Sequence, residues 1–126
     1  MGVSNVIVAG FGFRASADVA ALEAALASAQ RGLPRVTALA VPDDKYALAA
    51  ALAGALRLPL IRVDPVALRA ALPATRSAAS LAARGTGSVA EAAALAAAGP
   101  GARLLTHRHI SPDRRATCAI AEGFAA

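Results

Sequence analysis

Aromatic residues are scarce in this sequence, which has no tryptophan, one tyrosine and three phenylalanines among 126 residues. Proteins that bind single-stranded nucleic acid stack the bases on aromatic rings, and their basic residues gather on one face. The chain carries a net charge of +5, but its arginines are scattered along the sequence. We therefore expect no nucleic-acid partner.

Cysteine and long apolar runs are scarce as well. The single cysteine, Cys118, has no second thiol with which to form an internal disulfide or a cysteine-based zinc site. Charged residues, glycine or proline interrupt the alanine runs before they reach the ~20 apolar residues of a membrane-spanning helix. Residues 3–9 also lack the basic flank of a signal peptide. These absences predict a cytoplasmic protein with no membrane partner.

What the sequence does contain is alanine, which makes up much of its 57% hydrophobic share and favours helices. The length suits one domain, residues 1–126. Short apolar runs alternate three times with segments of helical spacing, and two further runs flank a Ser-Pro-Asp turn. The predicted strands cover residues 3–9, 36–41, 60–63, 103–110 and 116–121. This pattern predicts an α/β three-layer sandwich, with a mostly parallel sheet of about five strands and a C-terminal antiparallel hairpin.

The first predicted strand leads into the sequence GFGFRAS, which begins at Gly10 and has the outline of a dinucleotide-binding fingerprint. A nucleotide site would need an acidic residue about 20 positions later, and Asp43 comes too late for that role. Two alternatives remain for Gly10 and Gly12. They bring the backbone close to another ligand, or they only allow a tight turn into a helix capped by Ser16 or Asp18.

Two basic residues follow predicted strands. Ligands bind at the carboxyl ends of the strands in such sheets, so Arg14 and Lys45 are candidates for binding a carboxylate or phosphate. The alternative for Arg14 is an exposed loop arginine that binds no ligand. Lys45 stands in the first turn of a predicted helix, where a cation opposes the helix dipole. Its alternative is a solvated lysine paired with Asp43 or Asp44.

A third candidate segment is Gly-Thr-Gly-Ser-Val-Ala-Glu, residues 85–91. Ser88 stands three residues before Glu91, which is the spacing of a capping box at a helix start. The free N–H groups there, including that of Gly87, form a ready anion site. The alternative is a capping box in which the Ser88 and Glu91 side chains bond to these N–H groups, so that no ligand is needed. Glu91 can also act as an acid or base if the helix start is buried.

The two histidines, His107 and His109, alternate with Arg108 on a predicted strand, which predicts that both point to one face of the sheet. Two imidazoles on one face are two of the ligands that a metal site needs. No cysteine, aspartate or glutamate nearby in the sequence completes a set. We therefore expect solvated or core histidines, no bound metal and no cofactor.

The order of these segments resembles the CobE/CbiG C-terminal family of cobalamin biosynthesis. The resemblance covers essentially the whole chain and runs through residues 10–14, 39–45, 58–60, 87–95 and 117–121. Its most specific parts are the sequences Ser-Val-Ala-Glu-Ala-Ala-Ala-Leu and Thr-Cys-Ala-Ile-Ala. The resemblance implies a role in cobalamin biosynthesis.

Relatives of the CbiG type carry a further N-terminal region and open the lactone of a ring-contracted intermediate. We expect this chain to be closer to the stand-alone CobE type of the aerobic pathway. The implied partner is an anionic corrinoid or precorrin intermediate, ringed with acetate and propionate carboxylates, and other cobalamin pathway enzymes are candidate partners. The candidate ligand-binding residues are Gly10, Gly12, Arg14, Lys45, Gly87, Ser88, Glu91 and Thr117.

Two positions depart from the family pattern. Phe13 stands where related loops have cysteine, and Leu48 stands where a Lys-x-x-Glu pattern has its acid. Both changes remove a candidate reactive group, and so favour binding over catalysis. One alternative is a hydrolase that uses Glu91 with Lys45 or a histidine as acid and base. A more distant alternative is a nucleotide-binding module.

Overall fold

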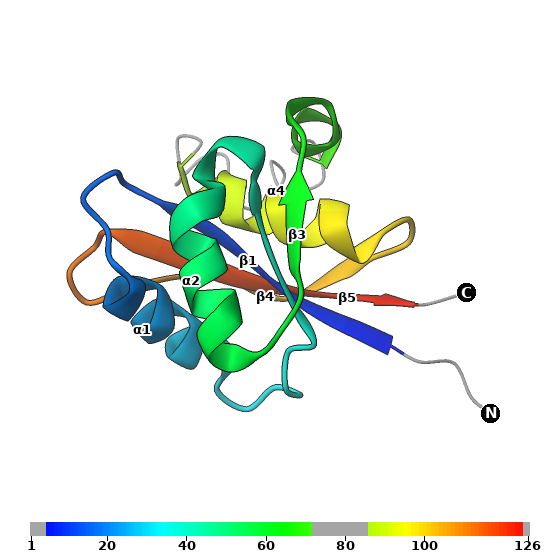
Figure 1. Ribbon diagram of the computed structural model, residues 1–126. Coiled ribbons are helices and arrows are strands. Elements are labelled where there is room, and N and C mark those ends of the chain that lie inside the picture. The colour runs from blue at the N-terminus through cyan, green and yellow to red at the C-terminus, as the bar shows by residue number, and fades with distance from the viewer. Residues whose placement is uncertain (1–4, 72–85, 125–126) are drawn as a thin grey trace.

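The computed structural model describes residues 5–71 and 86–124, and its five strands form one sheet (Figure 1). The strand order is β3-β2-β1-β5-β4. The pairs β1–β2 and β2–β3 are parallel, whereas β1–β5 and β4–β5 are antiparallel. The strands are β1 (Asn5–Phe13), β2 (Ala38–Pro42), β3 (Leu60–Val63), β4 (Arg103–Ile110) and β5 (Ala116–Phe124).

Helices cover both faces of this sheet. Alanine and leucine side chains of α1 and α2 pack with β1 residues such as Phe11 in one core cluster. Alanines of α4 pack with Val8 and Val63 in a second cluster on the opposite face. The helices with both ends described are α1 (Val19–Gln30), α2 (Tyr46–Leu56, preceded by the 3₁₀ turn η1, Asp43–Lys45) and α4 (Thr86–Ala98). Residues 65–71, after β3, are helical as well. The prediction of a three-layer α/β sandwich with five strands and a terminal antiparallel hairpin is confirmed.

Strand β1 continues beyond the end predicted for it. Its last residues pair with β5, where Phe11 lies opposite Cys118 and Phe13 opposite Ala116. Gly10 and Gly12 therefore belong to a central strand, and the prediction that they form the loop after it is wrong. The C-terminal hairpin supplies the hydrogen-bonding partner that extends the strand, and no local signal in the GFGF sequence shows that partner.

Glycine at position 10 allows α4 to approach the sheet. A Cβ at Gly10 would meet the carbonyl oxygen of Ala90 and the backbone nitrogen of Ala94, and one at Gly123 would meet the carbonyl oxygen of Ala98. The close approach expected at Gly10 is therefore made by helix backbone. Since Gly123 pairs with the start of β1, these contacts also show that α4 runs antiparallel to β1.

The start of α1 agrees with the prediction from the sequence, whereas the start of α4 does not. Asp18, one of the two predicted caps of α1, accepts a hydrogen bond from the N–H of Ala21 at 2.9 Å. Helix α4 begins at Thr86, so Ser88 lies inside the first turn and not at the helix start that was predicted for it. The carboxylate of Glu91 bonds instead to a backbone N–H of β4, a partner distant in sequence.

The two histidines of β4 point to opposite faces of the sheet. Register shifts occur between Leu104 and Thr106 and between Thr106 and His109. His107 faces α4, where its Nδ1 lies 3.4 Å from Oε2 of Glu91, whereas Nδ1 of His109 lies 3.4 Å from the Ser28 hydroxyl of α1. The prediction that both share a face is wrong, because an irregular strand loses the alternation on which it rested.

Candidate functional site

The segments that carry the candidate residues meet at one edge of the sheet, which we call the carboxyl edge: the ends of β1, β2 and β3 at Phe13, Pro42 and Val63. The turn between β4 and β5, residues 111–115, lies beside Phe13 because β5 starts opposite that residue. The N-terminus of α4 reaches the same edge, since this helix runs antiparallel to β1 (Figure 1). This edge is where open α/β sheets bind their ligands.

Lys45 lies at the carboxyl edge against an aromatic ring. Its Nζ is 5.4 Å from the centroid of the Phe13 ring, a cation–π distance. The neighbouring Asp43 pairs with Arg62 at 2.7 Å, and Arg62 also stacks over the ring of Tyr46 at 4.4 Å. The ring of Phe13 thus supports the lysine, and the carboxylate of Asp43 is paired with the guanidinium of Arg62.

Arg14 is exposed at the first position after β1. Its backbone N–H donates to the carbonyl oxygen of Arg115 at 2.9 Å, and the Arg115 guanidinium donates to the carbonyl oxygen of Ser16 at 3.4 Å. These bonds hold the chain after β1 to the turn after β4. Among the described residues, no side chain bonds to the guanidinium of Arg14, so its donors face solvent.

Thr117 and the two glycines lie behind this edge. The Thr117 hydroxyl donates to the carbonyl oxygen of Gly12 at 3.1 Å, across the β1–β5 pair. Gly10 is buried beneath α4. Thr117 and Gly12 are therefore close to each other and to Arg14, whereas Gly10 lies further inside the sheet.

The residues predicted on α4 divide into two groups. Gly87 and Ser88 lie in the first turn, whose backbone N–H groups have no partner within the helix. Glu91 is fully buried, and its Oε2 accepts a hydrogen bond from the N–H of Arg108 at 3.0 Å. Its Oε1 has no hydrogen-bonding partner among the described residues. A buried carboxylate does not reach a ligand at the surface.

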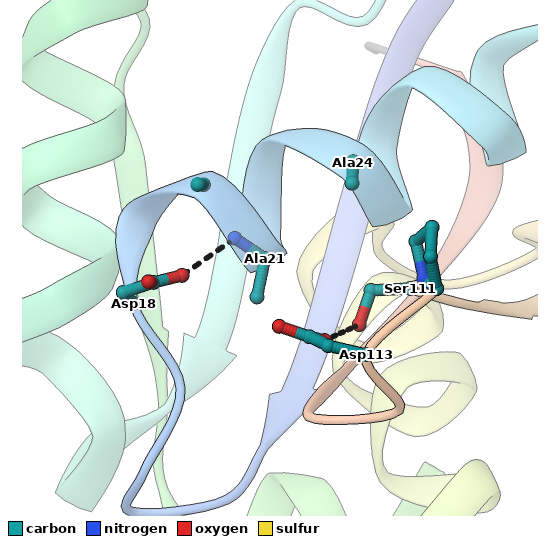
Figure 2. Close-up of a pocket in the computed structure, with 7 residues that line it drawn as sticks. Asp18, Ala21, Ala24, Ser111 and Asp113 are labelled. Atoms are coloured by element: carbon teal, nitrogen blue, oxygen red, sulfur yellow. Dashed lines mark hydrogen bonds between the residues drawn. The ribbon is translucent and has the colours of Figure 1, made fainter.

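A pocket that the sequence does not predict lies between α1 and the β4–β5 turn (Figure 2). It has a volume of about 230 Å³, and Asp18 and Asp113 lie on opposite walls. Ser111 donates to Asp113 at 2.6 Å, and this bond, with the N–H of Arg115, lowers the pKa of the Asp113 carboxyl. Two aspartates make this pocket unsuited to an anionic ligand. The Ser-Pro-Asp sequence predicts the turn, but the approach of α1 needs the tertiary structure.

Other reactive groups are few in the described part of the chain. No group of three metal-ligating side chains lies close enough together there to hold an ion. Cys118 is buried in the sheet, and burial raises the pKa of its thiol, which keeps it protonated and unreactive. None of the helices in the described ranges is long and apolar enough to cross a membrane.

The fold and this edge define an α/β sandwich protein with basic side chains at the carboxyl ends of its parallel strands. A family model described as "Cobalamin synthesis G C-terminus" matches residues 7–121. The chain belongs to this family of cobalamin biosynthesis proteins.

Two solved structures are similar over nearly the whole chain. One is cobalamin biosynthesis protein chiG from Agrobacterium tumefaciens str. C58, at 41% identity and a TM-score of 0.72, covering 92% of this chain and 97% of that one. The other is CobE, a protein from the cobalamin (vitamin B12) biosynthetic pathway, at 32% identity and a TM-score of 0.80, covering 97% and 93%. No curated protein sequence matches the chain.

Proposed function

We propose that this protein binds an anionic corrinoid intermediate at its carboxyl edge, in the cytoplasm and in the aerobic pathway. The observation that carries this proposal is the pair of cations there, Arg14 with unoccupied donors and Lys45 held over Phe13. A corrinoid intermediate carries several carboxylates around a flat ring. Guanidinium and ammonium groups bind carboxylates through charge-assisted hydrogen bonds.

The remaining candidates take different parts in this proposal. The first turn of α4, with Gly87 and Ser88, offers backbone N–H groups to a further carboxylate. Thr117 and Gly12, joined by a hydrogen bond, lie next to Arg14 on the sheet side of the proposed site. Gly10 contributes indirectly, because it lets α4 pack against β1 and so brings the helix N-terminus to the edge.

The nucleotide-binding alternative has less support. A phosphate-binding glycine loop follows a strand and presents its backbone N–H groups to the ligand. Here Gly10 and Gly12 are paired within β1, and the backbone of α4 occupies the space above Gly10. We therefore do not propose a nucleotide ligand.

A hydrolase remains a second candidate function, favoured by the contact between Glu91 and His107. The burial of Glu91 speaks against its direct action on a substrate. A protein that only binds would instead protect the intermediate and pass it to another enzyme of the pathway. The two functions are compatible with one binding edge.

Titration of the purified protein with a late corrin intermediate, followed by its visible spectrum, tests the proposed function. We expect a spectral change and co-elution at micromolar ligand. Arg14→Ala and Lys45→Ala should each weaken binding by roughly fivefold to tenfold, through loss of a charge-assisted bond. Arg35→Ala is the matched control, because Arg35 is an exposed arginine before β2, at the opposite edge of the sheet. Equal affinities in all four proteins would contradict the proposed site.

A further inference from the structure

A buried carboxylate lies behind an exposed imidazole on the face of the sheet that α4 covers. Glu91 is fully buried on α4, whereas the side chain of His107 on β4 is 65% exposed. Nδ1 of His107 lies 3.4 Å from Oε2 of Glu91. The same oxygen accepts the backbone N–H of Arg108 at 3.0 Å. The carboxylate therefore contacts two successive residues of β4.

The burial of Glu91 lowers the stability of the fold. A buried carboxylate oxygen without a hydrogen bond destabilises the fold, and Oε1 has no partner among the described residues. An apolar side chain of similar size would avoid the unpaired oxygen, but it would remove the acceptor for the N–H of Arg108. A buried polar group that remains unsatisfied in a native protein needs an explanation, and a catalytic role is one of the known explanations.

An ionised carboxylate can only accept hydrogen bonds. When it faces Nδ1 of a neutral imidazole, it favours the tautomer with the proton on Nδ1 and leaves the lone pair on Nε2. In His107, no described residue bonds to Nε2, and the ring is largely open to solvent. The lone pair of Nε2 is thus directed away from Glu91.

We propose that His107 is a catalytic proton acceptor through Nε2 and that Glu91 is its positioning residue. In the hydrolase expected from the sequence, Glu91 acts directly, with Lys45 or a histidine, as acid and base; here Glu91 acts only through His107. The proposal builds on the second candidate function, hydrolysis. It does not depend on corrinoid binding at the carboxyl edge, and its tests use no corrinoid.

The reaction that such an imidazole assists is the attack of water on an ester carbonyl. Water transfers a proton to Nε2 while its oxygen bonds to the carbonyl carbon. The bond from that carbon to the leaving oxygen then breaks, and the proton passes from Nε2 to the leaving oxygen or to solvent. Water is the only co-reactant, and His107 returns to its neutral form.

His109 is an internal control for this assignment. Its Nδ1 lies 3.4 Å from the Ser28 hydroxyl, and its Nε2 lies 3.0 Å from the Thr106 hydroxyl. Both ring nitrogens are occupied, and both partners are hydroxyls that either donate or accept. The chain has two histidines, so their signals are separable in one spectrum.

The first test is the tautomer of the neutral His107 ring, measured from its ¹⁵N shifts in the full chain at alkaline pH. We expect the proton on Nδ1 in the wild type. Glu91→Gln keeps a carbonyl for the Arg108 N–H but removes the charge, and it should shift His107 toward the Nε2–H tautomer, the usual form of free histidine. A wild-type His107 with its proton on Nε2 would overturn the proposal, and this measurement needs no variant to fold.

The second test is hydrolysis of p-nitrophenyl acetate as a probe ester. His107→Ala should lower the protein-dependent rate by roughly tenfold, and Glu91→Gln should lower it several-fold. His109→Ala should leave the rate unchanged. An unchanged rate in His107→Ala would overturn the proposal. Because neither test uses a corrinoid, a failure of this proposal is distinguishable from a failure of corrinoid binding at the carboxyl edge.

Discussion

Two glycines of this chain differ in what surrounds them. Gly10 lies in the central strand with the backbone of α4 directly above it, whereas Gly54 is exposed in α2, where an added Cβ would meet nothing within 4 Å. The sequence alone does not distinguish the two positions. Because their surroundings differ, we expect substitution by alanine to change the free energy of unfolding in opposite directions.

Gly10→Ala should destabilise the protein strongly, because helix backbone cannot move aside as a flexible side chain does. We expect a loss of roughly 2–4 kcal/mol in the free energy of unfolding, measured by urea denaturation. Gly54→Ala is the matched control and should increase it by about 0.5–1 kcal/mol, because alanine favours the helix. A Gly10→Ala variant as stable as the wild type would show that α4 does not pack as closely as described.

At the scale of elements, local signals predicted the strands and helices whose determinants lie within a few residues. Asp18 and the apolar run of β2 belong to this class. The sequence did not predict features that depend on a distant partner. β1 is extended by its pairing with β5, and Glu91 bonds to a residue of β4 that lies 17 positions further along the chain. The register shifts of β4, which depend on its pairing with β5, place His107 and His109 on opposite faces of the sheet.

In the candidate site too, local signals predicted positions but not contacts between distant segments. The positions of Arg14 and Lys45 at the carboxyl edge were predictable because each follows a strand, and parallel strands place their carboxyl ends together. The contact of Lys45 with Phe13 joins two segments about thirty residues apart and has no local signature. The pairing of Asp43 with Arg62 likewise needs the neighbouring strand β3.

The sequence left the cap of α1 open between Ser16 and Asp18, and the hydrogen bond from Ala21 assigns it to Asp18. Asp18→Ala should lower the free energy of unfolding by about 1 kcal/mol, since it removes the side-chain hydrogen bond to the N–H of Ala21 at the helix start. Ser16→Ala should change it by less than about 0.5 kcal/mol, because Ser16 is exposed and contributes its backbone carbonyl to Arg115. Thermal unfolding of both variants measures the difference, and equal losses would contradict the assignment.

At the scale of the whole molecule, the fold collects charge that is scattered along the sequence. The net charge is +5, and the sheet order places the turn after β4 beside the end of β1. Arg14 and Arg115 thereby become neighbours although about a hundred residues separate them. A ligand with several carboxylates at this edge would be attracted by both arginines and by Lys45.

This arrangement predicts that corrinoid affinity depends on salt. Between about 0.01 M and 1 M ionic strength the screening length falls from ~30 Å to ~3 Å, which weakens attraction between exposed charges. We expect the association constant to fall by roughly tenfold or more over this range, measured by spectral titration. The double variant Arg14→Ala/Lys45→Ala should show a smaller dependence, and Arg35→Ala should keep the wild-type slope. An affinity that does not change with salt would mean that apolar contact with the ring dominates binding, and that the carboxylates of the ligand do not meet these cations.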